Sequence, residues 1–430
     1  MDKIKITGGN KLNGIIPISG AKNAALPLMI ASLLSAETVC IENIPYLSDI
    51  EHLIRILANL GVDYSIDGRK ECAEEDSRRT IYFTAKNIIR TKAPYDLVSK
   101  MRASFWVLGP ILARMGEACV SLPGGCAIGT RPVSFILDGL EVLGADIAIE
   151  NGYVHAQAKN GLKGAFYRFP KVTVGGTHVL LMAASLANGE TTLENAAREP
   201  EIINLCQALQ AMGAQIEGVG TSTLHIKGKS SLHGAKQRVI FDRIEAGTYA
   251  MAVAMAGGKV LLAGAYSNYL TNVIDVLRYC GVIIQERSDG LLVSMGDTEL
   301  KSTDITTNPY PGFPTDLQAQ FMALMIRAKG TSHITETIFE NRFMHVQELA
   351  RLGAHISLAG QTAIIEGINK LQGAEVMATD LRASVSLVIA GLVAQGETTI
   401  SRVYHLDRGF ENLEKKLSNC GAQIKRLNAN

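Results

Sequence analysis

One unit of sequence recurs six times along this 430-residue chain, and the repeat restricts the possible folds more than any other feature. Each copy holds a short motif, in which an apolar position precedes Gly and then Ala or Val, followed by a strand-like stretch. The motif glycines, roughly 70 residues apart, are Gly61, Gly144, Gly213, Gly281, Gly353 and Gly421. Glycine suits the left-handed backbone at which many helices end. The chain is therefore predicted to contain six similar supersecondary units.

Each unit is predicted to contain two helices of different character. The segment before the motif glycine is amphipathic, as in IEHLIRILANLG at residues 50–61, where apolar residues recur at three- and four-residue spacing. An earlier segment is apolar on nearly every face, as in HVLLMAASLA at residues 178–187. Such a helix is buried on all sides, and about 11 residues are too few to span a bilayer. A strand-like stretch such as SAETVCIEN at residues 35–43 separates the two helices.

The two ends of the chain complement one another. KIKITGGNKLNGIIPIS, residues 3–19, resembles the strand pairs that precede buried helices, whereas the chain stops after one strand of its last unit. The N-terminal strand pair is therefore predicted to complete the sheet that the C-terminus leaves open. We predict an α+β fold of two domains, each with three buried helices inside three outer sheets. An open solenoid is less favoured because solenoids have polar capping repeats, and these terminal units resemble the inner ones.

Charge and composition exclude several classes of protein. The chain has 42 basic and 41 acidic residues, and a net charge of +1 attracts neither nucleic acid nor an anionic membrane. We expect no signal peptide and no membrane span, since no apolar run approaches the required ~20 residues. The 7 cysteines and 9 histidines form no C-x-x-C or H-E-x-x-H pattern. The sequence thus predicts a cytoplasmic, reduced protein without metal or cofactor.

Basic residues stand where several predicted helices begin. Lys22, Arg102 and Arg382 precede buried helices, and Arg131, Arg342 and Arg408 precede amphipathic ones. A helix N-terminus carries partial positive charge and binds anions, so a cation there needs an anionic partner.

The anionic partner differs between these positions. For Arg382 and Arg408, a neighbouring acid, Asp380 or Asp407, is as good a partner as a ligand. Lys22, Arg102 and Arg131 have no acid within a few residues on the loop side, and there we expect a phosphate or carboxylate ligand. The chain has no G-x-x-x-x-G-K-[ST] motif, which argues against a P-loop nucleotidase.

Cys126 lies in SLPGGCAIGTRP, residues 121–132, between glycines and five residues before Arg131. A nearby cation lowers the pKa of a thiol and makes it a useful acid or nucleophile. The other six cysteines lie in apolar or repeat contexts and are expected to be inert.

Nine segments, in this order, resemble motifs of the enolpyruvyl transferases that act on UDP-N-acetylglucosamine: SGAKNAALP, APYDLV with MRAS, SLPGGCAIGTRPV, ENAAREPEI, DRIEAGT, FPTDLQAQF, FENRFMHV, MATDLRAS and HLDRGFE. The resemblance covers essentially the whole chain. It implies an inside-out α/β barrel, or α/β prism, of two domains with the active-site cleft between them. One domain would span residues 22–240 and carry the cysteine loop at about 122–132, and the other would combine 1–21 with 241–430.

The reaction that the resemblance implies is addition followed by elimination. The enolpyruvyl group of phosphoenolpyruvate moves to the 3′-hydroxyl of UDP-N-acetylglucosamine through a tetrahedral ketal, and phosphate is released. No cofactor or metal is implied. In this family the reaction is the first committed step of peptidoglycan synthesis, which connects it to cell shape and division.

The resemblance also implies roles for individual residues. Cys126 would be the acid, form an adduct with phosphoenolpyruvate and react with epoxide inhibitors, and Asp316 would accept the sugar hydroxyl proton. Catalytic residues would be Cys126, Asp316, Lys22, Arg408 and Asp380, and phosphoenolpyruvate would contact Lys22, Asn23, Arg131, Arg382 and Arg408. UDP-N-acetylglucosamine would contact Arg102, Arg131, Pro132, Val133, Ser134, Phe135, Lys171, Val172, Thr173, Val174, Asp316 and Ile338. Asp242 and Arg342 are further candidates, and Ser48 stands where many relatives carry lysine.

Three other functions are compatible with parts of the sequence. A synthase acting on shikimate 3-phosphate would share the fold and donor, but the cysteine loop and FENRFMHV argue against it. A UDP-sugar sensor without catalysis should have lost Cys126, Lys22, Asp316 or Arg408, and all four are present. Nucleic-acid processing is disfavoured by the balanced charge and the lack of aromatic-basic patches.

Overall fold

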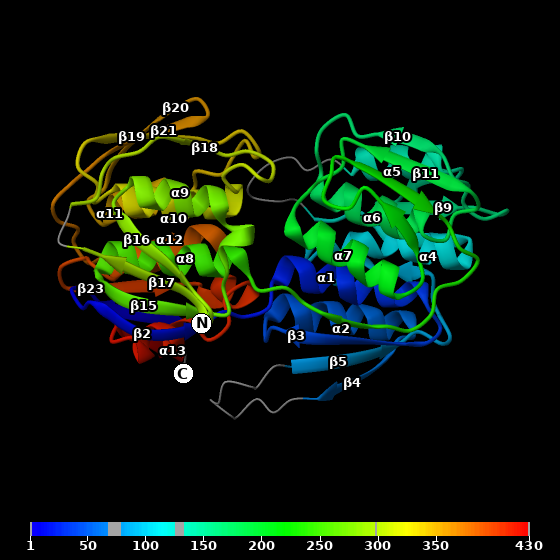
Figure 1. Cartoon of the computed structure of the whole chain (residues 1–430), viewed down its shortest axis with the longest axis horizontal. Helices are drawn as coiled ribbons and strands as arrows, with labels where there is room; N and C mark the ends of the chain where they lie inside the picture. The colour runs from blue at the N-terminus through cyan, green and yellow to red at the C-terminus, as the bar shows by residue number, and fades with distance from the viewer. Residues whose placement is uncertain (1, 68–78, 125–132, 297–298, 429–430) are drawn as a thin grey trace. The chain divides into compact units, whose positions relative to one another are not determined.

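The computed structural model describes residues 2–67, 79–124, 133–296 and 299–428. Contacts between Cα atoms divide the chain into two compact units. Unit 1 takes the chain up to Ser19 and from Phe241 onward, and unit 2 takes the described residues between Gly20 and Ile240. Figure 1 shows both units, with the N-terminal strands in blue and the C-terminal elements in red.

The described residues of unit 1 form three four-stranded sheets, each with one parallel pair followed by two antiparallel pairs. The first sheet has the order β22 (Glu375–Met377), β23 (Glu397–Ser401), β1 (Lys3–Thr7) and β24 (Gln423–Leu427). The second has the order β2 (Leu12–Pro17), β15 (Gly258–Ala263), β17 (Gly290–Met295) and β16 (Val282–Arg287). The third has the order β18 (Ile305–Thr306), β19 (Thr331–Thr335), β21 (Thr362–Glu366) and β20 (His355–Ala359).

The described residues of unit 2 repeat this arrangement with three further sheets. The first is β14 (Lys236–Arg238), β3 (Thr38–Ile44), β5 (Arg79–Thr84) and β4 (Asp63–Asp67). The second is β6 (Lys92–Ala93), β7 (Glu117–Ser121), β9 (Tyr153–Gln157) and β8 (Asp146–Glu150). The third is β10 (Phe166–Arg168), β11 (Glu190–Glu194), β13 (Thr223–Lys227) and β12 (Gln215–Glu217).

Both predicted kinds of helix are present in unit 1 and in unit 2. The apolar, almost fully buried ones are α8 (Arg243–Ala256), α10 (Gln318–Met325) and α12 (Leu381–Gly391) in unit 1, and α1 (Lys22–Ala31) and α6 (Val174–Ala184) in unit 2. The third apolar helix of unit 2, α4 (Leu108–Met115), is buried up to Leu112 and ends at the exposed Met115. The outer ones are α9 (Thr271–Tyr279), α11 (His345–Arg351), α13 (Leu413–Asn419), α2 (Ser48–Leu60), α5 (Ser134–Val142) and α7 (Pro200–Ala211). Short helices are α3 (Tyr95–Val98), η1 (Ser32–Leu34), η2 (Arg102–Val107), η3 (Ser267–Tyr269), η4 (Thr315–Leu317) and η5 (Val403–Arg408).

The repeat prediction is confirmed by these elements, and the solenoid alternative is wrong because the sheets surround two separate cores. All six motif glycines have φ between 90° and 102°, the left-handed backbone expected where the outer helices end.

The N-terminal strand pair was predicted correctly only in part. β1 lies between β23 and β24 and completes the C-terminal sheet. β2 instead pairs in parallel with β15 in another sheet. The reason is positional: like β10 before α6, β2 directly precedes a buried helix, and strands in this position take the parallel edge of a sheet.

Candidate active site

The N-terminal ends of buried helices meet within unit 1, where α8, α10 and α12 contact one another and η4 contacts α8. Asp242 caps α8, because its carboxylate accepts hydrogen bonds from the backbone N–H groups of Ile244 and Glu245 at 2.8 and 3.0 Å. Asp380 caps α12 in the same way, from Arg382 and Ala383, also at 2.8 and 3.0 Å. An N-cap of this kind stabilises a helix by about 1 kcal/mol. Both predicted aspartates therefore help to form the local structure.

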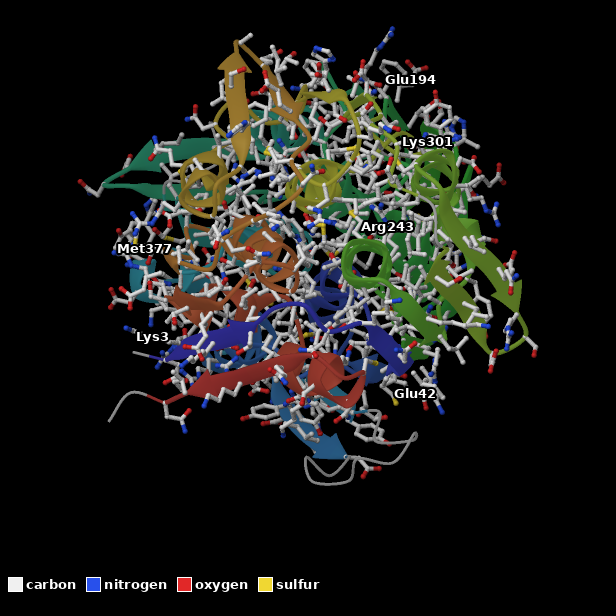
Figure 2. The ribbon with its side chains drawn as sticks, turned by 90° about the vertical axis from the view of Figure 1, so that its left-hand side faces the viewer. Lys3, Glu42, Glu194, Arg243, Lys301 and Met377 are labelled. Atoms are coloured by element: carbon white, nitrogen blue, oxygen red, sulfur yellow. The ribbon has the colours of Figure 1, made fainter. Side chains whose placement is uncertain are left out.

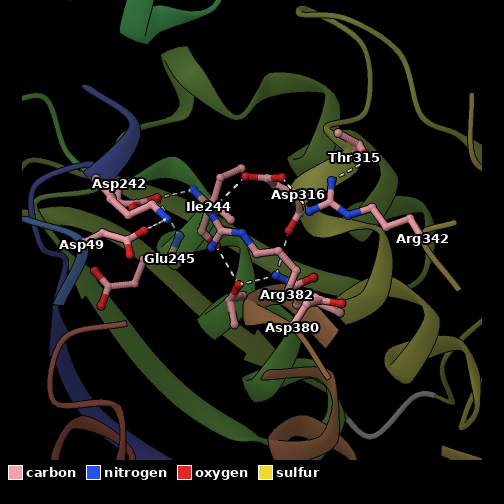
Figure 3. A network of polar contacts seen from close by, with 12 residues as sticks. Asp49, Asp242, Ile244, Glu245, Thr315, Asp316, Arg342, Asp380 and Arg382 are labelled. Atoms are coloured by element: carbon pink, nitrogen blue, oxygen red, sulfur yellow. Dashed lines mark hydrogen bonds and ion pairs between the residues drawn. The ribbon is translucent and has the colours of Figure 1, made fainter. Parts of the chain in front are cut away.

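Asp316 lies in η4 between two arginines (Figure 3). Its Oδ1 accepts a hydrogen bond from Nη2 of Arg342 at 2.8 Å, and its Oδ2 accepts one from Nη2 of Arg382 at 2.9 Å. Both arginine side chains are buried. Burial by itself raises the pKa of the Asp316 carboxyl, but the guanidinium groups of Arg382 and Arg342 outweigh it and hold that pKa well below its usual value. With both ion pairs formed, Asp316 is an ionised and weakly basic carboxylate.

The neighbouring-acid alternative is wrong for Arg382, and for Arg408 it stays a prediction. Asp380 accepts from the backbone of Arg382, while the side chain of Arg382 pairs with Asp316, 66 residues away. Asp407 accepts from Arg426 at 2.5 and 3.0 Å. Adjacent residues at the start of a helix point in different directions, so sequence proximity did not identify the ion pair of Arg382.

One donor of Arg382 has no hydrogen-bond partner among the described residues. This is Nη1, which is buried while Nη2 contacts Asp316. A buried guanidinium nitrogen without a partner is energetically costly, so this donor is available to an anionic ligand. Arg408 lies in η5, which contacts α12. The predicted anion-binding arginines Arg382 and Arg408 therefore come from elements that pack together.

Two histidines flank this cluster and are neutral near pH 7. Burial lowers the pKa of His345 to about 4, with Asp380 opposing this shift and Arg342 adding to it. Burial and the charge of Arg408 lower the pKa of His405. The arginines, rather than these imidazoles, therefore supply the positive charge at this end of unit 1.

Lys22 in unit 2 has an acidic partner that sequence reasoning missed. It begins α1, and its Nζ lies 3.0 Å from Oδ2 of Asp49 in the first turn of α2; both side chains are buried. The absence of a nearby acid in the sequence was the basis for expecting a ligand anion here, and that basis is wrong. Asp49 lies 27 residues away along the chain. The only sequence feature that marks it as a candidate partner is its place as an acid in the first turn of a helix. Asn23 follows Lys22 in the same turn.

Most other residues predicted to contact the sugar nucleotide lie at the N-terminal ends of unit 2 helices. Arg102 begins η2, which contacts α1 and α6. Lys171 and Val172 precede α6, Thr173 caps it by accepting from Gly176 N at 3.3 Å, and Val174 is its first residue. Val133, Ser134 and Phe135 form the start of α5, which contacts α6. Cys126, Arg131 and Pro132 lie outside the described residues.

The five described cysteines are all unactivated thiols. Burial raises the pKa of each of them: Cys40, Cys119, Cys206, Cys280 and Cys420. A thiol becomes nucleophilic or acidic at neutral pH when its pKa is lowered. The expectation that these cysteines are inert is therefore supported, and the chemistry predicted for Cys126 has no substitute among them.

A surface cavity of about 250 Å³ in unit 1 contains none of the predicted site residues. Lys3 and Met377, labelled in Figure 2, line it together with Glu348 and Arg351. Two of its charged side chains already have polar partners, since Glu348 accepts from the backbone of Met377 at 2.8 Å and Arg351 donates to the carbonyl of Glu375 at 2.9 Å. The cluster around Asp316 is therefore the better candidate site.

No group of three or more His, Cys, Asp and Glu side chains in the described ranges is arranged to hold a metal ion. Within the same ranges, no helix combines the length and the apolar character needed to cross a membrane.

Comparison with known proteins gives a consistent result. Residues 6–417 match the family described as EPSP synthase (3-phosphoshikimate 1-carboxyvinyltransferase). UDP-N-acetylglucosamine 1-carboxyvinyltransferases of Brucella ovis and Brucella canis are each 69% identical to the chain over 99% of its length and 100% of theirs. The solved enolpyruvyl transferase NikO of Streptomyces tendae has a TM-score of 0.89 at 26% identity, covering 100% of this chain and 99% of NikO. EPSP synthase of Acinetobacter baumannii, at 20% identity over 100% of both chains and a TM-score of 0.74, shares the fold.

Proposed function

The chain belongs to the EPSP synthase family of enolpyruvyl transferases, and on this basis we propose that it transfers the enolpyruvyl group of phosphoenolpyruvate to the 3′-hydroxyl of UDP-N-acetylglucosamine. The observation that carries the proposal is Asp316, a carboxylate held between two buried arginines at the ends of packed helices. The 69% identity to UDP-N-acetylglucosamine 1-carboxyvinyltransferases favours this acceptor over shikimate 3-phosphate.

The donor carries a phosphate and a carboxylate and needs cations for both. We assign the phosphate to Lys22, Asn23, Arg131 and Arg408. The unpartnered Nη1 of Arg382 supports assigning the donor carboxylate to this residue. A bidentate contact between this guanidinium and a carboxylate would compete with its bond to Asp316.

This competition has a chemical consequence. Asp316 is a poor base while two arginines neutralise it. When the donor carboxylate draws Arg382 away, the pKa of Asp316 rises and the carboxylate can accept the proton of the sugar hydroxyl. The base would therefore become active only when the donor is bound.

The reaction follows in two balanced steps. A proton adds to C3 of phosphoenolpyruvate, the sugar oxygen bonds to C2, and Asp316 takes the hydroxyl proton, which gives a tetrahedral ketal. Loss of a proton from C3 then re-forms the double bond as the C2–O bond to phosphate breaks. Cys126 is assigned as the acid and Asp380 as a second carboxylate near the reacting carbons. The arginines stabilise the charge that develops on phosphate.

The product would be an early intermediate of peptidoglycan, and we propose a cytoplasmic site of action. An epoxide that resembles phosphoenolpyruvate is expected to alkylate Cys126, since an activated thiolate opens such a ring.

Phosphate release tests the proposal. Wild-type protein is mixed with phosphoenolpyruvate and either UDP-N-acetylglucosamine or shikimate 3-phosphate, and Cys126→Ala is compared with Cys119→Ala as a matched cysteine control. Release only with UDP-N-acetylglucosamine, retained in Cys119→Ala and greatly slowed in Cys126→Ala, is the expected result. Release with shikimate 3-phosphate would favour a synthase of that type. Binding of UDP-N-acetylglucosamine without any release would favour a sensor.

A further inference from the structure

Glu336 is a buried carboxylate for which the proposed reaction gives no role. It directly follows β19, and only 1% of its surface is exposed. Its Oε1 accepts hydrogen bonds from Oγ1 of Thr307 at 2.9 Å and from the backbone N–H groups of Ile338 and Phe339 at 2.8 and 3.1 Å. Its Oε2 accepts one from Oγ1 of Thr315 at 2.8 Å. A carboxylate taken out of water in this way is costly unless its hydrogen bonds are made, and here they are made to neutral groups.

The bond to Thr315 fixes the direction of a hydrogen-bond chain. A threonine hydroxyl has one proton, and Thr315 uses it on Glu336, so its lone pairs must face the other contact. That contact is Nη1 of Arg342, which donates to Thr315 at 2.7 Å. The second terminal nitrogen of Arg342 donates to Asp316 at 2.8 Å. Figure 3 shows Thr315, Arg342 and Asp316 in this order.

Glu336 also fixes Phe339, whose ring lies against the Arg342 guanidinium. The ring of Phe339 lies 5.3 Å from the centre of that guanidinium, and the backbone amide of Phe339 is bound by Glu336. Ile338, predicted to contact the sugar nucleotide, is bound by the same oxygen. One carboxylate therefore anchors both the segment 337–339 and the arginine that orients Asp316.

We propose that Glu336 is a positioning residue for enolpyruvyl transfer, which acts through Thr315 and Arg342 to orient the Asp316 carboxylate toward the acceptor hydroxyl. The inference rests on the proposed function. Arg342 is the arginine that keeps Asp316 in place when Arg382 turns to the donor, so its own alignment decides where the base lies. A displacement of about 1 Å at a reacting group can slow a reaction about 100-fold.

Glu336→Gln tests this role because the amide keeps the shape but can accept from only one of its two ends. We expect kcat for phosphate release to fall about 10- to 100-fold, while the KM for phosphoenolpyruvate changes less than threefold. Glu366→Gln, an exposed glutamate on β21, is the matched control and should be unchanged. Thr315→Val breaks the same chain at its next link and should lower kcat similarly, whereas Thr315→Ser keeps the hydroxyl and should retain activity.

The double variant Glu336→Gln/Thr315→Val separates positioning from general destabilisation. Residues that act through one chain are non-additive, so the double variant should be no more than about threefold slower than the worse single variant. Multiplicative losses, or an unchanged kcat in Glu336→Gln when wild type is active, would overturn the inference and leave the proposed function intact. If Glu336→Gln does not fold, the contrast between Thr315→Val and Thr315→Ser decides instead. Wild-type protein that releases no phosphate would overturn both proposals.

Discussion

A buried ion pair in unit 1 allows a stability prediction that is independent of function. Nζ of Lys416 on α13 lies 2.6 Å from Oε1 of Glu245 on α8 and 2.7 Å from Oγ of Ser19. Oε2 of Glu245 accepts from the backbone N–H of Ser19 at 2.7 Å. The side chains of Lys416 and Glu245 are only 11% and 2% exposed. Lys416→Met would leave a buried, unpaired carboxylate, which costs about 3–5 kcal/mol of unfolding free energy.

The loss of stability in Lys416→Met should depend on pH, and the structure fixes the direction of this dependence. Burial raises the pKa of Glu245, and the Lys416 ammonium partly opposes this, so the variant has a still higher pKa. The folded variant then binds a proton more tightly than the unfolded chain. Stability therefore falls as pH rises from the usual carboxyl pKa to the raised one, by up to about 1.4 kcal/mol per pH unit. The substitution should cost more at pH 8 than at pH 5.

Urea unfolding followed by circular dichroism measures the cost, and hydrogen exchange in α8 assigns it to unit 1. Lys415→Met, at the exposed neighbouring position, should change stability by less than about 0.5 kcal/mol. Lys416→Met/Glu245→Gln removes the unpaired charge and should cost less than the single variant. A loss below about 1 kcal/mol at pH 8 for Lys416→Met, or a larger loss at pH 5, would refute the reasoning.

Three further predictions concern packing, titration and catalysis. Gly228→Ala should lower the free energy of unfolding by about 3 kcal/mol, because a Cβ there would lie 1.6 Å from the carbonyl oxygen of Ala187. Gly353→Ala, where φ is 94° and the space is open, should lower it by only about 1–2 kcal/mol. Denaturant unfolding compares the two variants. Burial lowers the pKa of His178 to about 3, so stability should fall as pH drops below the unfolded value of about 6.5, and His178→Leu should flatten this dependence in melts between pH 7 and 5. Asp316→Asn should slow single-turnover phosphate release about 10²- to 10⁴-fold, and the exposed control Asp275→Asn on α9 should not; equal rates in the two variants would exclude Asp316 as the base.

The fold could be predicted from the sequence because its repeat is local. Apolar segments such as residues 178–187 are typical of buried helices, and the αL glycines mark where the outer helices end. These patterns depend on residues close together in the chain, so they can be recognised without the tertiary structure. The pairing of β2 with β15 depends on a partner more than 240 residues away, and only the sheet itself revealed it.

The chemistry of the site was likewise predictable from the sequence only in part. The sequence by itself determined which residue types stand at the helix starts, among them Lys22, Arg382 and Asp316, and that they bind an anionic substrate stays a prediction. Only the tertiary structure decided their partners: Asp49 for Lys22, and Asp316 rather than Asp380 for Arg382. Hydrogen bonds and ion pairs depend on distance and direction in space, and the folded chain brings together groups that the sequence separates. The role proposed for Glu336 rests entirely on such contacts, which the sequence alone does not show.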